Sequence, residues 1–212
     1  MPIDAARIRA LIGRLSRLSE SQGSAIENIV TQFERSFRFV GNPVSDLISD
    51  CMLREFGDTL RIHHCFSAEA FTKDKFEYAL ERVGNFCGLS AARAPRGNRG
   101  HDITIRGVPF SLKTQADAKI RANFIHISKF MELGRGQWGD KPADLEGLRD
   151  SFLGHMQGYE RILTLRYFRD RQEHAYEMVE IPKALLAEAA GGAFEMMADS
   201  RQFPKPGTCT VV

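Results

Sequence analysis

The first part of the chain repeats apolar residues at intervals of three and four, which is the spacing of one helix face. The segment "NPVSDLISDCMLREF", residues 42–56, adds Asn42, suited to cap a helix, and Pro43, suited to its first position. These patterns predict packed amphipathic helices over the first 56 residues. The apolar positions upstream of Asn42 are Ile26, Ile29, Val30, Phe33 and Phe37.

A further helix is expected over residues 72–87, where an apolar stripe is followed by Gly88 as a plausible stop. Glu77 lies about 100° from Phe76 around the helix axis, and so on the shoulder of the stripe. The stripe consists of Phe76, Leu80, Val83 and Cys87.

The second half of the chain contains strand patterns. "RILTLRYF", residues 161–168, and "HAYEMVEI", residues 174–181, alternate like strands joined by a polar turn. Residues 144–158 look helical, and "SAARAPRGNRG", residues 90–100, is expected to be a basic loop because it is rich in Gly, Pro and Arg. The predicted fold class is α/β, an α+β mixed-sheet core with flanking helices. We expect a single domain, 1–212, with a helical portion over 1–60 and the mixed-sheet core over 61–212.

The stretch "GHDITIRGVPFSLKTQ", residues 100–115, predicts a hairpin. If Arg106 and Gly107 form the turn, one face carries only apolar side chains and the other carries Asp102, Ser111 and Lys113. Asp102 and Lys113 then lie diagonally across two strands, about 5–8 Å apart at Cβ. An acid, a lysine and a divalent metal could therefore share one reacting phosphate. The alternative is an ordinary cross-strand ion pair on a solvated face.

Charge is unevenly distributed along the chain, although the net charge is only +2. Residues 91–129 hold eight basic residues against two acids, or +6, which leaves −4 for the rest. This positive segment surrounds the hairpin and favours a polyanionic partner.

Composition bounds the cellular setting. The four cysteines show no CxxC spacing, and no cleavable signal or long apolar run is present. We therefore expect free thiols, no membrane span and a cytoplasmic protein. The histidines have no trusted metal-ligand spacing and are expected to be packing or surface residues.

Three motifs together resemble the PD-(D/E)xK nuclease superfamily, which includes most type II restriction endonucleases. They are "FE" at residues 76–77, "GHD" ending at Asp102, and "FSLKT" containing Lys113. The resemblance implies a metal-dependent phosphodiesterase. Asp102 and the main-chain carbonyl of Leu112 would bind Mg²⁺, and Lys113 would position or activate the attacking water.

Two residues depart from the superfamily pattern. His101 stands where a proline is common, and Ser111 replaces the second acid. A hydroxyl is a poor substitute for an anionic ligand of Mg²⁺. Because some members of the superfamily recruit a glutamate from a neighbouring helix, Glu77 is the chosen second acid, with Glu132 in reserve.

The positive segment supplies the expected DNA contacts. Its arginines and lysines are suited to phosphate oxygens, and Gln115 could orient water or pair with backbone. The expected DNA-binding residues are Arg93, Arg96, Arg99, Gln115, Lys119, Arg121 and Lys129.

The resemblance and the charge distribution together favour a Mg²⁺-dependent type II restriction enzyme acting on double-stranded DNA. A palindromic site cut in both strands would require a two-fold symmetric homodimer. Two alternatives stay open, a monomeric repair nuclease that nicks one strand and a non-catalytic DNA-binding module.

Overall fold

The computed structural model describes residues 3–116, 120–123, 125, 138–139, 141–169, 174–201 and 203–211. It divides into two compact units, residues 1–69 and 70–212. The boundary lies close to the expected change from helical portion to sheet core at residue 60. That the chain acts as a single domain stays a prediction.

Unit 1 is helical, as its apolar spacing predicts. It contains α1 (Ala5–Leu15), α2 (Glu20–Glu34) and α3 (Asp50–His64). The expectation of a helix beginning at Asn42 is wrong. Asn42 instead accepts a hydrogen bond from the main-chain N–H of Val44, and α3 begins after Ser49, whose hydroxyl accepts from the N–H of Met52.

Unit 2 begins with α4 (Lys73–Phe86), close to its expected bounds. Thr72 caps its first turn by accepting from the N–H of Lys75, and Gly88 follows it with a positive φ of 79°. Phe76 and Leu80 are fully buried. Each such side chain contributes roughly 1.5–3 kcal/mol through its removal from water.

The main sheet has five strands in the order β1-β2-β3-β4-β5. They are β1 (Ala91–Arg93), β2 (Ile103–Ile105), β3 (Val108–Gln115), β4 (Arg161–Arg169) and β5 (His174–Ile181). Only the β3–β4 pair is parallel, so the sheet is mixed. The α+β class with a mixed sheet and flanking helices is therefore confirmed.

The predicted hairpin is present. Arg106 and Gly107 have positive φ angles of 52° and 80°, and Ile105 and Ile103 pair with Val108 and Phe110. This pair of angles is the type I′ turn that joins tightly connected strands.

The predicted loop over 90–100 is wrong at its start, where β1 forms. Ala91 and Ala92 pair with β2, and the side chain of Asn85 exchanges two hydrogen bonds with Ala91 at 2.8 Å each. The small side chains permit pairing at this edge of the sheet, a signal that the Gly, Pro and Arg content obscured.

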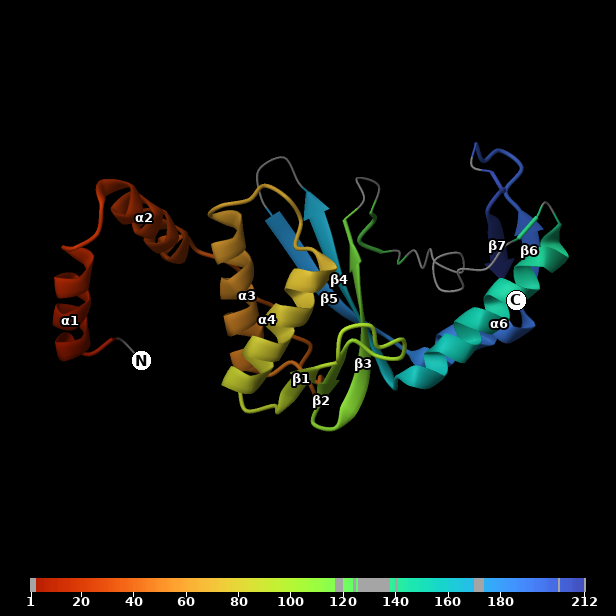
Figure 1. Cartoon of the computed structure of the whole chain (residues 1–212), viewed down its shortest axis with the longest axis horizontal. Coiled ribbons are helices and arrows are strands. Elements are labelled where there is room, and N and C mark those ends of the chain that lie inside the picture. The colour runs from red at the N-terminus through yellow and green to blue at the C-terminus, as the bar shows by residue number, and fades with distance from the viewer. Residues whose placement is uncertain are drawn as a thin grey trace. The chain divides into compact units, whose positions relative to one another are not determined.

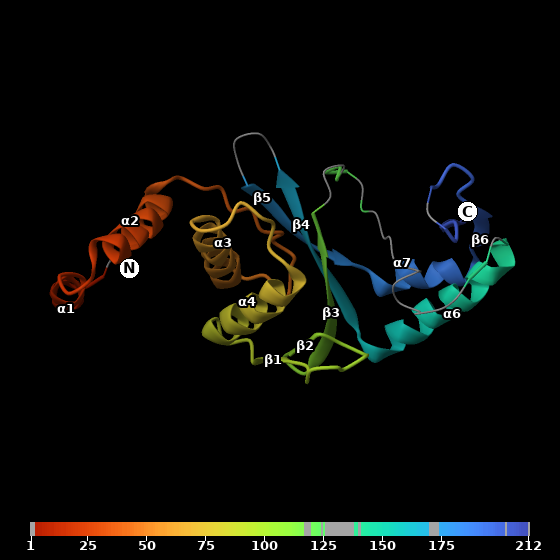
Figure 2. The same ribbon diagram turned by 45° about the horizontal axis from the view of Figure 1, so that its top comes forward.

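The parallel β3–β4 connection passes through η1 (Pro142–Leu145), α6 (Glu146–His155) and η2 (Met156–Gly158). After β5 come α7 (Lys183–Ala187), η3 (Glu188–Gly191) and a small sheet of β6 (Ala193–Met196) and β7 (Gly207–Thr210). Within unit 2, α4 lies against the β1–β3 part of the main sheet, whereas α6 leads from the sheet toward β6 (Figures 1 and 2).

The structure bears on the expected free thiols and on the expected lack of a membrane span. Cys65 and Cys209 are free thiols, but Cys51 and Cys87 are disulfide-bonded, so the expectation of four free thiols is wrong. None of the described helices is long and apolar enough to cross a membrane.

Candidate active site

Asp102 lies where β2 begins, beside the continuing edge of β3. Its main-chain N–H donates to the carbonyl of Phe110 at 2.8 Å, which fixes the residue in the hairpin. Its carboxylate Oδ2 accepts from the main-chain N–H of Leu112 at 2.6 Å. The carboxylate therefore satisfies an N–H of β3 that lies beyond the Ile103–Phe110 pair and that the short strand β2 leaves unpaired.

Ser111 links Asp102 to Lys113. The Lys113 ammonium donates to Ser111 Oγ at 2.8 Å, and Ser111 Oγ donates to Asp102 Oδ2 at 3.3 Å. Ser111 is almost completely buried, whereas Lys113 is half-buried. The predicted proximity of Asp102 and Lys113 is thus present, with the serine as the connecting group.

The first turns of α4 bring Lys73 and Glu77 to the same carboxylate. Lys73 Nζ lies 2.7 Å from Asp102 Oδ1 and 3.5 Å from Glu77 Oε1. Two carboxylates from distant parts of the chain therefore converge on one cation. Glu77 is brought together with Asp102, while Glu132 lies outside the described residues.

Electrostatics at this cluster follow from partial burial. Burial raises the pKa of the Glu77 carboxyl, and the Asp102 charge raises it further against the opposing effect of Lys73. Burial alone would lower the pKa of Lys73, but the hydrogen bond and charge of Asp102 outweigh it, so that this pKa is raised. The two acids repel each other and are stabilised by a shared cation.

His155 and Tyr159 line the site from the end of α6 and the segment after it. Burial, then the positive charge of Lys113, lowers the pKa of His155. Burial and the Asp102 charge raise the pKa of Tyr159 to about 12. Their rings meet edge to face with centroids 5.4 Å apart, so His155 is no isolated surface residue.

The oxygen donors suit a hard divalent cation. A residue in a strand directs its N–H and C=O toward the same edge, so the carbonyl of Leu112 points to the edge at which Asp102 lies. Asp102, Glu77 and this carbonyl are the ligand types that Mg²⁺ prefers. Among the described residues no group of three or more His, Cys, Asp or Glu side chains is placed to hold a metal ion, and Asp102 and Glu77 supply the two carboxylates of this cluster.

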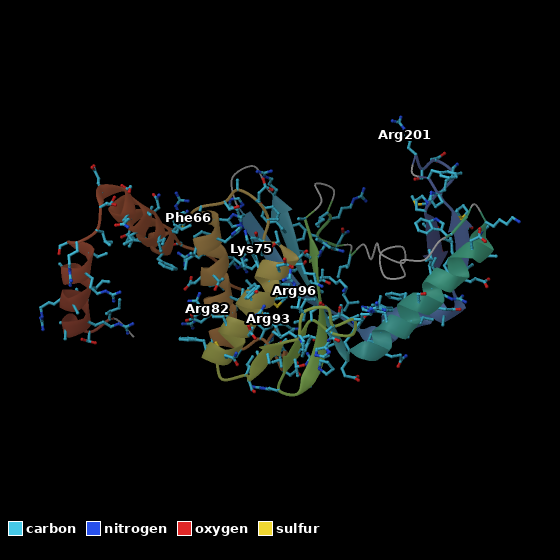
Figure 3. All side chains as sticks on the ribbon, viewed as in Figure 1. Phe66, Lys75, Arg82, Arg93, Arg96 and Arg201 are labelled. Atoms are coloured by element: carbon cyan, nitrogen blue, oxygen red, sulfur yellow. The ribbon has the colours of Figure 1, made fainter. Side chains whose placement is uncertain are left out.

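The expected DNA-binding residues differ in availability. Arg96 and Arg99 are exposed, whereas Arg93 pairs with Glu81 at 2.6 Å and stacks its guanidinium 3.6 Å from the Tyr78 ring centroid. Figure 3 shows Arg93 and Arg96 near α4. Arg96 and Arg99 are therefore exposed to solvent, whereas Arg93 is already paired.

The remaining expected contacts lie at and beyond the end of β3. Gln115 is half-buried at the end of that strand, and Arg121 is exposed. The main-chain carbonyl of Arg121 accepts from the buried guanidinium of Arg166 at 2.5 Å, which fixes this segment. Lys119 and Lys129 lie outside the described residues.

Sequence reasoning missed Lys73, His155 and Tyr159. Lys73 could have been found, because it stands four residues before Glu77 and must share its helix face. His155 and Tyr159 carry no local signal. They reach the site only because the β3–β4 crossover returns the chain beside Asp102, where Gly158 packs closely on Gly100.

Comparisons with known proteins identify the family of the chain. The family profile described as "SmaI: Type II site-specific deoxyribonuclease" matches residues 11–212. The type II restriction enzyme SmaI of Serratia marcescens is 45% identical over 164 residues, which are 76% of this chain and 64% of that enzyme. The chain thus spans somewhat less than two thirds of this relative. No solved structure matches. The chain belongs to the SmaI family of type II site-specific deoxyribonucleases.

Proposed function

We propose that the chain is a Mg²⁺-dependent endonuclease that hydrolyses phosphodiester bonds at a specific site in double-stranded DNA. The observation that carries this proposal is the convergence of Asp102 and Glu77 on one cation, Lys73 Nζ, beside Lys113. Family membership supplies the reaction class. Family membership favours a restriction enzyme over a non-catalytic DNA-binding module. Such a module would have no need of clustered acids and lysines.

Mg²⁺ would be held by Asp102, Glu77 and the main-chain carbonyl of Leu112. When bound, the ion would neutralise charge that develops on the scissile phosphate. Lys73 would then yield its place between the carboxylates. Because Lys73 is bound mainly through Asp102 and its side chain is 41% exposed, it can turn toward solvent without disturbing the core.

Lys113 would position the attacking water and stabilise negative charge on the phosphate oxygens. Its ammonium has three donors, and Ser111 Oγ accepts one of them, which directs the remaining donors. Ser111 would therefore act as the residue that holds Lys113 and Asp102 in register. This role would compensate for the lack of a second acid at position 111.

DNA would be bound through the basic segment around the hairpin. Arg96 and Arg99 would contact phosphates directly, and Lys119, Arg121 and Lys129, which follow Gln115 in the sequence, would supply further phosphate contacts. Arg93 would contribute its charge from within its pair with Glu81. Since these contacts are with the backbone, they position the duplex and leave sequence reading to other residues.

A type II enzyme that cuts both strands of a palindrome would act as a homodimer, one active site per strand. We place the protein in the cytoplasm because its proposed substrate is there. The whole chain, 1–212, would act as one nuclease domain.

The test is cleavage of supercoiled plasmid with Mg²⁺ by the wild-type chain and by Asp102→Asn, Glu77→Gln and Lys113→Ala. Each change should lower the rate by orders of magnitude, because each removes a group that acts on the transition state. Asp74→Asn is the matched control, an exposed acid on the same helix as Glu77, and should keep full activity. Full activity of Asp102→Asn and Lys113→Ala would remove this cluster from the reaction.

A further inference from the structure

The first two helices expose apolar residues that helices of folded proteins normally bury. Neither α1 nor α2 contains a buried residue, whereas α3 buries three and α4 five. Ile12 is 59% exposed, and Val30 is 48% exposed. A helix of 11 residues such as α1 is marginal in water without a packing partner.

These apolar residues form the same pattern on both helices. In each helix they recur at intervals of three, one and three, which places them on one face. The stripe of α1 consists of Ile8, Leu11, Ile12 and Leu15, and that of α2 consists of Ile26, Ile29, Val30 and Phe33. Of these, Phe33 already contacts α3, because the Arg61 guanidinium lies 5.2 Å from its ring centroid.

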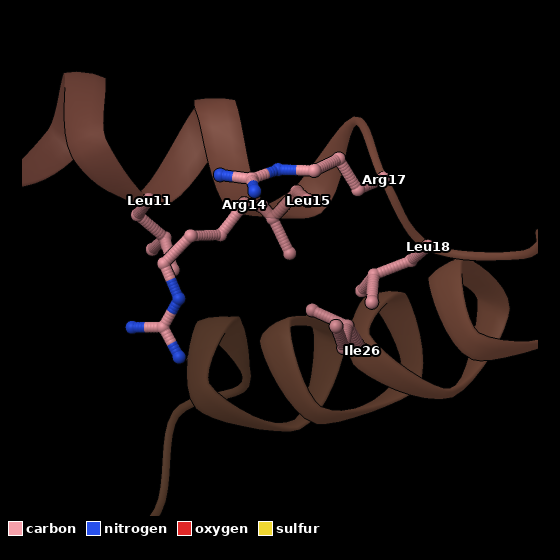
Figure 4. A pocket seen from close by; sticks show the side chains of 6 residues that line it. All are labelled: Leu11, Arg14, Leu15, Arg17, Leu18 and Ile26. Atoms are coloured by element: carbon pink, nitrogen blue, oxygen red, sulfur yellow. The ribbon is translucent and has the colours of Figure 1, made fainter.

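A hollow of about 590 Å³ lies between the two helices. Leucine and isoleucine side chains from both helices line it, and two arginines of the α1 end border it (Figure 4). Its lining residues are Leu11, Arg14, Leu15, Arg17, Leu18 and Ile26. The hollow can accept apolar side chains from another molecule.

The two helices carry opposite charges. α1 contains Arg7, Arg9 and Arg14 and no acid, whereas α2 contains Glu20, Glu27 and Glu34 and no base. Within the described part of the chain, none of these six side chains forms an ion pair. Arg7 and Arg14 are seven residues apart, as are successive glutamates of α2. Two arginines of one helix can therefore pair with two glutamates of a neighbouring helix at the same time.

We propose that α1 and α2 form a dimer interface with a second copy of this chain, in which α1 of each copy packs on α2 of its partner. The inference rests on the proposed function in that it assigns a surface to the proposed homodimer. A two-fold interface needs a patch that is complementary to itself. A basic helix and an acidic helix with matching apolar stripes make such a patch, because the two-fold axis brings each opposite the other.

The charge pattern favours a second copy over other occupants. A DNA backbone would repel the three glutamates of α2, and an anionic lipid surface would repel them equally. A second copy of the chain offers each of the two helices a partner helix of opposite charge. Burial of the two stripes would also supply the packing that α1 lacks.

The experiment is a charge exchange, read by sedimentation equilibrium without DNA up to about 100 µM. One variant carries Arg7→Glu with Arg14→Glu, and the other carries Glu27→Arg with Glu34→Arg. Each variant alone should dimerise at least about tenfold more weakly than wild type, because like charges then face each other. An equimolar mixture should form heterodimers with near wild-type affinity, since both contacts again join opposite charges.

A second pair of substitutions provides the control for net charge. Arg38→Glu with Arg201→Glu makes the same charge change as the Arg7→Glu with Arg14→Glu variant, at exposed positions outside the two helices, and should dimerise like wild type. Circular dichroism of each variant checks that its helices persist. If a charge-exchange variant fails to fold, the single substitutions Arg7→Glu and Glu27→Arg replace the pairs in the same mixing test.

Three results would overturn the interface: a monomeric wild type, variants that dimerise like wild type, or a mixture that stays monomeric although both chains are folded. Plasmid cleavage separates this failure from failure of the proposed function. If the wild type dimerises and cuts DNA while the charge-exchange test fails, only the assignment of the dimer surface falls. A monomeric wild type that still cuts DNA would also remove the proposed homodimer but would leave the proposed nuclease activity standing.

Discussion

Replacing Lys73 with glutamine should weaken the metal-free fold and strengthen metal binding. The Lys73 ammonium donates to Asp102 at 2.7 Å and lies 3.5 Å from Glu77. Without it the two carboxylates face each other with no cation between them. A divalent ion would also no longer compete with an internal cation for the same oxygens, so the two effects have one cause.

The size of both effects follows from the exposure of the pair. A hydrogen bond to a charged group is worth about 1.5–3 kcal/mol. The side chains of Lys73 and Asp102 are 41% and 19% exposed, so solvent screening brings the contribution to about 1 kcal/mol. For a chain of this length that corresponds to a melting temperature lower by about 2–4 °C. The same free energy would lower the dissociation constant for Mg²⁺ about fivefold.

The assay is thermal unfolding of wild type and Lys73→Gln over a Mg²⁺ titration. Lys75→Gln, an exposed lysine on the same helix, is the matched control and should change neither quantity. Without metal, Lys73→Gln should have a lower melting temperature than wild type. Its melting temperature should then rise more than that of wild type with each addition of Mg²⁺. If Lys73→Gln bound Mg²⁺ more weakly than wild type, Lys73 would support the metal site instead of competing with it, and the reasoning would be refuted.

Three further predictions concern DNA, pH and the serine. Replacing both Arg96 and Arg99 with Glu should reduce the salt slope of non-cognate DNA binding by about 2, measured by fluorescence anisotropy, and an unchanged slope would exclude these contacts. Because burial lowers the pKa of His155 below its usual 6.5, protonation disfavours the folded state, and stability falls as the pH drops below that value. His155→Phe should lose less stability than wild type between pH 7 and pH 5 in urea unfolding, and an equal loss would contradict this. Ser111→Ala should lower single-turnover cleavage roughly fivefold, because Lys113 loses an acceptor worth about 1 kcal/mol. Full activity of Ser111→Ala would show that Ser111 does not orient Lys113 for cleavage.

The sequence predicted those parts of the fold whose signals are local. The bounds of α4 follow from its stripe and Gly88, and the hairpin follows from alternation around Arg106 and Gly107. The start of α3 was misplaced because Asn42 and Ser49 are both good capping residues. Only tertiary packing decides which of two such caps begins a helix.

The candidate site was predicted in part. Asp102, Ser111 and Lys113 share one face of a hairpin, so alternation alone could bring them together. Glu77 required the superfamily resemblance, since nothing local relates a helix shoulder to a strand 25 residues away along the chain. His155 and Tyr159 could not be predicted, because their place depends on the β3–β4 crossover.

The partners of charged residues were also beyond the sequence. Arg93 was expected on DNA, yet it lies in a bidentate contact with Glu81 and over Tyr78. The number and spacing of charged residues in the sequence show where positive charge is concentrated. Which of these charges are already paired depends on the positions of the side chains in the structure. The net field around the hairpin is therefore a safer inference than any single contact.

The central claim is tested most directly by digesting a DNA of known sequence with the wild-type chain and Mg²⁺, then sequencing the ends. We expect discrete fragments whose ends all fall within one short recurring sequence, and no cleavage when the divalent ion is chelated. Intact DNA at high enzyme concentration, or ends scattered without a common sequence, would contradict it.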